Sequence, residues 1–228
     1  MKILLFNKGK LLIISFLLAI GISGIAQSGA VFMGMNIGGY TTGLGNLDAR
    51  VYEFNKTYPE SDLKNPGMLS GLNMGFRFGG ESVVFELAGS WKSSRSNTVS
   101  YQKDNESYKI KLKTKVSTIN MGVLFDISGS QSLYFGTSMD LGLTKIMKKN
   151  ALESSYSKAD WQSVLGEDKS SPFMGASLSL LYVIPFFEFR AYYQIPWFSS
   201  NYSGDNFVLH GNYGISICFR YGSKEANL

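Results

Sequence analysis

Apolar and polar residues alternate along most of the chain beyond Ala30. In the stretch LNMGFRF (72–78), apolar side chains take the even positions, whereas Asn73, Gly75 and Arg77 take the odd ones. Alternation with period two predicts a strand whose two faces meet different surroundings. The same pattern predicts eight strands, within 30–40, 72–78, 83–91, 119–126, 133–142, 174–180, 187–194 and 213–221.

The predicted connections alternate between short and long. Tight turns are expected at 79–82, 128–131 and 183–186, and long polar loops at 41–68, 92–108, 145–171 and 196–209. Short turns on one rim and long loops on the other are typical of outer-membrane barrels. The pattern therefore predicts an all-β fold, an eight-stranded antiparallel up-and-down transmembrane β-barrel.

In each predicted strand, alternate residues form two sets, one on each face of the strand, and each set is called a parity. The composition of the two parities indicates which face lies on the outside of the barrel. The polar parity is rich in Gly and Ser, which suits a narrow, side-chain-filled lumen better than a water-facing surface. The apolar parity ends in aromatic residues at both rims, as interfacial girdles do. The girdle residues are Phe76, Phe78, Phe85, Phe125, Phe135, Phe187, Phe219 and Tyr221 at the short-turn rim, and Trp91, Tyr193 and Trp197 at the other. The alternative is the aromatic core of a secreted lipocalin-like barrel.

Charged residues stand on the parity assigned to the lumen. The aromatic stretch FFEFRAYYQIPWF (186–198) shows this, because Glu188 and Arg190 share one parity within it. Isolated buried charges are very costly, so pairing is expected. The network could be a structural plug of ion pairs or a proton or ion relay. Its predicted members are Arg77, Glu86, Asp126, Asp140, Glu188, Arg190 and Arg220.

The N-terminus has the features of an export signal. Lys2, Lys8 and Lys10 precede an apolar segment at 11–22, and Gly24 and Ala26 are small residues at a cleavage site. We expect a signal peptide at 1–26 and a barrel domain at 27–228. The whole chain has 22 Lys+Arg and 17 Asp+Glu, and loss of three lysines would leave 19 against 17, or +2. This balance gives no support to nucleic-acid binding.

Few residues suit catalysis or metal binding. One Cys and one His exclude an intramolecular disulfide, a multi-thiolate site and zinc held by clustered histidines. His210 follows Asp205 in a Ser-rich loop, where Ser199, Ser200 or Ser203 could complete a triad. Any Ser-rich loop offers that arrangement, so we expect no catalytic residues, no cofactor and no metal.

The long loops offer candidate contact residues. Exposed Tyr and Trp favour partner contact, although packing within the loops is an equal alternative. The candidates are Tyr52, Tyr58, Tyr156, Trp161 and Tyr202. A capping box at 157–160 with Gly166 as a stop predicts a short helix.

A basic stripe precedes the fourth strand. Lys109, Lys111, Lys113 and Lys115 alternate with apolar residues, which suggests an extramembrane extension of that strand. The stripe could meet anionic lipid headgroups or form a solvated edge.

A signal peptide ending in GIAQ, followed by eight alternating strands with Gly-studded inward faces, resembles the small outer-membrane β-barrels of the PorT-like family. The plan is also similar to OmpA/OmpX-type barrels, and the resemblance covers nearly the whole mature chain. The C-terminal KEANL departs from the terminal aromatic of many such barrels, although ICFRYG carries Phe219 and Tyr221 just upstream. The resemblance implies a Gram-negative outer membrane and embedding in its lipid. It does not imply one function, because members include adhesive, structural and secretion-associated barrels.

The sequence therefore predicts a non-enzymatic outer-membrane barrel whose extracellular loops bind a protein partner or surface ligand. A narrow small-solute or ion channel is the alternative, and an outer-membrane enzyme comes third. A lumen enclosed by eight strands is only wide enough for its own side chains, which argues against a porin. The sequence does not indicate an oligomeric state.

Overall fold

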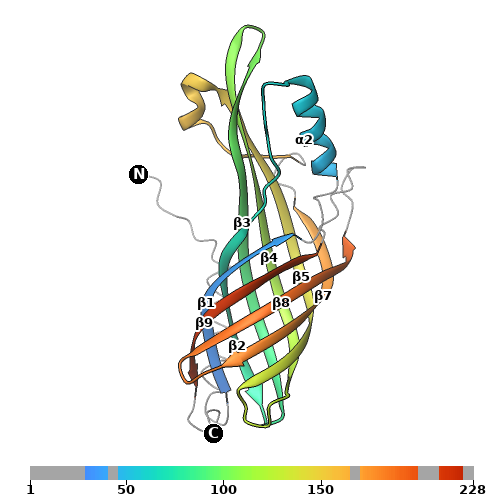
Figure 1. The fold of residues 1–228 in the computed structure, drawn as a ribbon, viewed down its shortest axis with the longest axis vertical. Coiled ribbons are helices and arrows are strands. Elements are labelled where there is room, and N and C mark those ends of the chain that lie inside the picture. Colours follow the sequence, from blue (N-terminus) through green and yellow to red (C-terminus); the bar gives the residue numbers. More distant parts are fainter. Residues whose placement is uncertain (1–28, 41–45, 165–169, 200–210, 223–228) are drawn as a thin grey trace.

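A closed antiparallel barrel forms the body of the protein (Figure 1). The computed structural model describes residues 29–40, 46–164, 170–199 and 211–222. The strands of the wall are β1 (Gly29–Tyr40), β2 (Leu69–Gly79), β3 (Val83–Lys103), β4 (Glu106–Asp126), β5 (Leu133–Leu152), β7 (Ser171–Val183), β8 (Phe187–Ser199) and β9 (Asn212–Gly222). Consecutive wall strands pair, and β1 pairs with β9, so no edge is left along the body of the barrel. The predicted eight-stranded up-and-down barrel is confirmed.

The outside of the barrel is apolar. Side chains such as Ile119 and Ile215 are more than half exposed, whereas their inward neighbours Thr118 and Ser216 are buried. An eight-stranded wall with large apolar groups outside and polar groups inside is a transmembrane β-barrel. The exposed girdle residues are Phe78, Phe85, Phe125, Phe135, Phe187, Phe219 and Tyr221 on the turn side, with Trp91, Tyr193 and Trp197 towards the long loops. Phe76 is half-buried.

Tight turns close one rim where they were predicted, with the strands resuming at Val83, Leu133 and Phe187. At the opposite rim, the structure of the connections differs from the prediction. Segments 92–108 and 145–171 were expected to be long polar loops, but β3 and β4 are each 21 residues long and β5 is 20, against 11 to 13 for the other wall strands. The three long strands continue together beyond the barrel (Figure 1). The predicted extension of the fourth strand at 109–115 is confirmed.

The β3–β4 hairpin closes in a two-residue turn at its far tip. Asp104 and Asn105 both have positive φ, 52° and 63°. Such a turn twists in the same sense as the strands, so it favours a long regular hairpin. Asp and Asn tolerate this backbone region better than most residues.

A bulge interrupts the β3–β4 ladder between Arg95 and Thr98. Ser96 Oγ accepts a hydrogen bond from the backbone N–H of Leu112 at 2.8 Å, which replaces a ladder bond lost at the bulge. The neighbouring Asn97 accepts a bond from the backbone N–H of Lys64 at 2.8 Å. Its amide also donates to the carbonyl of Asp62 at 2.6 Å. The bulge therefore ties the segment that precedes β2 to the extension.

Helix α2 (Asn46–Thr57) packs on this extension. Leu47 and Val51, spaced four residues apart, turn one helical face inward. They form a small core with Leu63, Tyr101, Ile110, Leu112 and Ile146. Asp48 in the first turn and Lys56 in the last suit the helix dipole. This unit of α2, residues 58–68 and the ends of β3, β4 and β5 is called the extramembrane subdomain below.

The prediction of a short helix that begins at the capping box, residues 157–160, is wrong. A 3₁₀ helix, η1 (Glu153–Lys158), ends where that helix was expected to begin, and Ala159 is extended. The chain then forms the short strand β6 (Gln162–Ser163), which pairs with β5 at Met147 and Lys148. Within the described residues, no helix has the length and apolar character needed to cross a bilayer.

Candidate functional site

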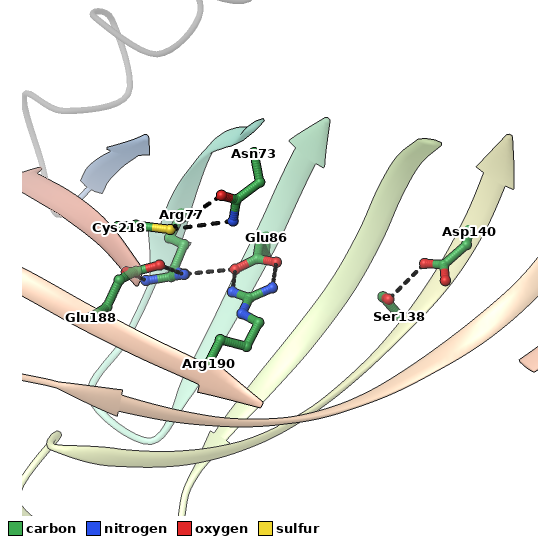
Figure 2. Close-up of polar contacts among 8 residues, drawn as sticks. All are labelled: Asn73, Arg77, Glu86, Ser138, Asp140, Glu188, Arg190 and Cys218. Atoms are coloured by element: carbon green, nitrogen blue, oxygen red, sulfur yellow. Dashed lines mark hydrogen bonds and ion pairs between the residues drawn. The ribbon is translucent and has the colours of Figure 1, made fainter. Parts of the chain in front are cut away.

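Four charged side chains from β2, β3 and β8 meet inside the barrel (Figure 2). Arg77 Nε donates to Glu86 Oε2 at 2.7 Å, and Arg77 Nη2 donates to Glu188 Oε1 at 2.8 Å. Arg190 Nη1 donates to Glu86 Oε1 at 2.7 Å, and its second nitrogen also contacts Glu86. Side-chain exposure is 6% for Arg77, 4% for Glu86, 1% for Glu188 and 14% for Arg190. This charge quartet is neutral in sum, and Arg77 bridges both acids.

Phe32 and Cys218 pack against one side of the quartet. Arg77 stacks over the Phe32 ring at 4.3 Å from its centroid, and Arg190 lies 5.6 Å from the same centroid. Gly75 makes room for this ring, because a Cβ there would lie 2.6 Å from Phe32 Cζ. Cys218, 1% exposed, packs with Phe32 beside the quartet. Desolvation of this kind strengthens the ion pairs and raises the cost of breaking one.

A second polar layer centres on Asp140, which is fully buried. Its carboxylate accepts bonds from Asn120 Nδ2 at 2.5 Å, from Ser138 Oγ at 2.8 Å and from Gln194 Nε2 at 2.5 Å. Ser177 Oγ donates a further bond. Several donors on one carboxylate offset much of the cost of burying its charge.

Lys92 extends this layer across the lumen. Its ammonium donates to Asn212 Oδ1 at 3.0 Å and lies 4.2 Å from the Tyr192 ring centroid. Asn212 donates in turn to Gln194, which donates to Asp140. A hydrogen-bonded path thus joins the buried Lys92 to Asp140. The sequence prediction missed Lys92, because it was assigned to a loop, although it stands on the lumen parity of an uninterrupted strand.

The lumen is closed above and below these layers. Towards the long-loop rim, Leu69, Val116 and Phe173 form a buried apolar plug. Gly142 makes room for Phe173, since a Cβ at that position would collide with its ring. On the turn side a second apolar cluster consists of Leu124, Tyr134, Leu181 and Val183.

Two cavities lie on opposite sides of the quartet. One, of about 60 Å³, is lined by Glu86, Arg190 and Lys92 among others. Tyr192 OH and Ser216 Oγ line it and have no protein partner among the described residues. Such a volume is large enough to hold water, and these two hydroxyls would bind it. The other cavity, of about 260 Å³, is lined by Arg77 and the turn-side apolar cluster.

Two predicted network members lie elsewhere. Asp126 is half-buried at the end of β4, where it accepts bonds from Ser128 Oγ at 2.7 Å and from the backbone N–H of Gln131 at 3.0 Å. It therefore closes a turn rather than joining the quartet. Arg220 lines the larger cavity with Arg77 and Tyr134.

Of the aromatic residues predicted to make loop contacts, some are exposed at the surface and others pack within the extramembrane subdomain. Tyr52 is 70% exposed on the outer side of α2. Tyr58 packs with Phe54 and Tyr101, at ring-centroid distances of 5.0 and 4.5 Å. Tyr202 lies outside the described residues, as do His210, Asp205, Ser200 and Ser203 of the possible triad. Across the described residues, no group of His, Cys, Asp and Glu is placed to hold a metal ion.

Tyr156 and Trp161 lie against lysines of the extension. Lys149 Nζ is 4.8 Å from the Tyr156 ring centroid, and Lys113 Nζ is 5.7 Å from that of Trp161. Both distances are in the range of cation–π attraction. The segment after β5 therefore folds back over lysine side chains of β4 and β5.

Nearby charges and hydrogen bonds shift the pKa of two side chains in the extramembrane part of the protein. Glu153 pairs with Lys109 at 2.5 Å, and hydrogen bonds from Lys109 and Ser107 lower the pKa of Glu153. Desolvation lowers the pKa of Lys113, and the nearby positive charges of Lys115 and Arg95 lower it further.

No protein-family model and no curated protein matches the chain. Solved structures with a similar fold include Ail, the attachment invasion locus protein of Yersinia pestis, at 15% identity, 85% coverage of this chain, 98% of that chain and a TM-score of 0.45. OprG from Pseudomonas aeruginosa aligns at 10% identity, 86% and 96% coverage and a TM-score of 0.45. Neisserial surface protein A aligns at 10% identity, 86% and 97% coverage and a TM-score of 0.37. The assignment of the fold rests on the closed ladder and the apolar exterior.

Proposed function

We propose that the chain is an exported outer-membrane protein whose sealed barrel anchors a partner-binding extramembrane subdomain. The observation that carries this proposal is the contrast between the two halves of the molecule. The lumen is filled by the charge quartet, the Asp140–Lys92 layer and the apolar plug. Outside the barrel, the subdomain has its own small core and presents the exposed face of α2. We also propose cleavage of residues 1–26 and keep the PorT-like family as the proposed relation.

Partner contact is assigned to the exposed side of α2. Tyr52 there is 70% exposed and belongs to none of the buried clusters. A rigid aromatic side chain with a polar tip loses little entropy when it binds, so Tyr is common at the centre of interfaces. We propose a protein partner, and no catalysis or cofactor is part of the proposal.

The binding role is tested by affinity capture from native membranes with tagged wild-type protein and two variants. Tyr52→Ser should lose a partner that the wild type retains, at a cost of about 2 kcal/mol or more if Tyr52 is a hot spot. Lys103→Ser, at the far tip of the hairpin, is the matched control and should retain it. Equal capture by the wild type and both variants would remove α2 from the proposal.

The runner-up is a narrow channel, which the two lumen cavities favour. Planar-bilayer recording decides between the two functions. We expect no sustained conductance from the wild type, because the apolar plug and the two charged layers block the path. A reproducible open state would promote the channel.

A further inference from the structure

The outward face of the extramembrane extension is strongly basic. On β4, the lysines at 109–115 take the parity opposite to the buried Ile110 and Leu112. Residues paired across an antiparallel ladder lie on the same face, so β3 and β5 contribute to it. The basic pairs are Arg95 with Lys113, Lys111 with Lys149, and Lys115 with Lys145.

This arrangement is unfavourable without an anionic partner. Like charges directly opposite on adjacent strands destabilise a sheet. Among the described residues, the ion pair on this face joins Glu153 to Lys109. That leaves Arg95, Lys111, Lys113 and Lys115 with no carboxylate partner in the described part of the chain, although Lys113 also lies against the Trp161 ring.

Protection of a sheet edge does not explain these lysines. Lysines commonly blunt edge strands, where unpaired backbone would attract other chains. Strand β4 is no edge, because β3 and β5 pair with it along the whole stripe. The charges therefore need another reason, and an anionic ligand supplies one.

The basic face directly continues the lipid-facing wall. The outward row of Trp91, Ser117 and Leu143 is followed by the row that contains Lys115. Trp91 and Leu143 are 45% and 50% exposed, as expected at the border of the apolar region. The first cations therefore stand where lipid headgroups begin.

The height of the face indicates the kind of headgroup. Successive outward rows are about 6.6 Å apart along a strand, or about 5 Å along the membrane normal at a tilt near 40°. The rows of Lys115, Lys113 and Lys111 then lie about 5, 10 and 15 Å above the row of Trp91. The headgroup zone of an ordinary bilayer is only about 5–7 Å thick. Phosphates of a simple phospholipid would reach the lowest row alone.

We propose that Arg95, Lys111, Lys113 and Lys115 form a binding site for a phosphorylated membrane glycolipid whose phosphates stand at more than one height above its acyl chains. Lys115 takes the lower phosphate, next to the apolar belt. Lys111, Lys113 and Arg95 take phosphate higher on the headgroup. This site faces the lipid around the barrel and is separate from the exposed side of α2.

The test measures lipid affinity of the folded full-length protein in phosphatidylcholine nanodiscs. The probe is lipid A, a diglucosamine lipid with two phosphates, titrated and quantified by native mass spectrometry. The variant is Lys111→Gln/Lys113→Gln/Lys115→Gln. A basic residue near an anionic surface contributes about fivefold in affinity, so the triple variant should bind about a hundredfold more weakly. Heat-modifiable migration in SDS checks that each variant is folded.

A charge-matched control separates the site from general basicity. Lys56→Gln/Lys64→Gln/Lys103→Gln removes three exposed lysines of the subdomain that lie off this face and should bind lipid A like the wild type. Phosphatidylglycerol and inorganic phosphate should both bind more weakly than lipid A. Equal affinity of the wild type and the Lys111/Lys113/Lys115 variant would overturn the site. Equal affinity for phosphatidylglycerol would overturn the multi-phosphate ligand, and preference for a soluble sulfated oligosaccharide would overturn the lipid source.

Discussion

Arg77 bridges both acids of the charge quartet, and its removal is therefore the sharpest test of the lumen. Glu188 has hydrogen bonds to Arg77 alone among the quartet arginines, whereas Glu86 also binds Arg190. Arg77→Met would leave Glu188, at 1% exposure, without its hydrogen-bonded partner. Removing one partner of a buried ion pair typically costs about 3–5 kcal/mol. Water in the adjoining cavities would place this cost towards the lower end.

The double variant Arg77→Met/Glu188→Gln supplies the internal control. It removes both members of one pair, keeps the bidentate Arg190–Glu86 pair and restores the neutral sum of the quartet. Replacing a whole buried pair by neutral groups is often nearly neutral in free energy. We therefore expect the double variant to be about 2 kcal/mol more stable than Arg77→Met alone, although it carries one more substitution.

Reversible denaturant unfolding in lipid vesicles measures these differences, with Lys103→Met at the exposed hairpin tip as the neutral reference. The pairing argument is refuted if Arg77→Met costs less than about 1 kcal/mol, the value expected of a solvated ion pair. It is also refuted if Glu188→Gln adds a further loss to Arg77→Met instead of a recovery. Either result would mean that the quartet is hydrated and weakly coupled.

Three further outcomes test the wall, the plug and the extension. Ala191→Arg puts an unpaired charge on the lipid face and should cost about 2–4 kcal/mol in vesicle unfolding, whereas no effect would mean that the parity of this strand is reversed. Gly142→Leu should displace the Phe173 ring and cost about 1–3 kcal/mol by overpacking, and an unchanged midpoint would contradict a filled lumen. The pKa of Glu153 is lowered in the fold, so its contact with Lys109 should be present above the carboxyl's unfolded pKa and be lost as pH falls through the lower folded pKa. Titration of Glu153 by NMR measures this pKa. A pKa at the ordinary value of a glutamate would contradict the contact with Lys109.

Period-two patterning predicted the wall because the two environments of a membrane barrel differ sharply in polarity. The same contrast is absent beyond the lipid, where both faces of a strand can be polar or aromatic. Segment 92–108 reads KSSRSNTVSYQKDNESY, with little alternation, and was therefore assigned to a loop. The one local signal was Asp104–Asn105, a pair suited to a two-residue hairpin turn.

The lumen contacts were partly accessible to sequence reasoning. Parity alone placed Glu188 and Arg190 on one face, but it could not show that each has its main partner on another strand, Arg77 and Glu86. Those contacts depend on the stagger of the barrel and on which arginine reaches across it. Helix α2 was missed because only Leu47, Val51 and partly buried aromatics mark its inner face, against an otherwise polar segment.

The long strands β3, β4 and β5 run without a break from the membrane wall into the extramembrane subdomain. In evolution, such a continuous ladder restricts how the subdomain can change length. A one-residue insertion in β4 would turn its lysines inward and its core residues Ile110 and Leu112 outward, because side chains alternate. Growth or shortening of the subdomain is therefore expected in steps of two residues, matched on the paired strands, except where a bulge such as that between Arg95 and Thr98 absorbs one extra residue. The distance of α2 from the membrane should accordingly vary among relatives in discrete increments.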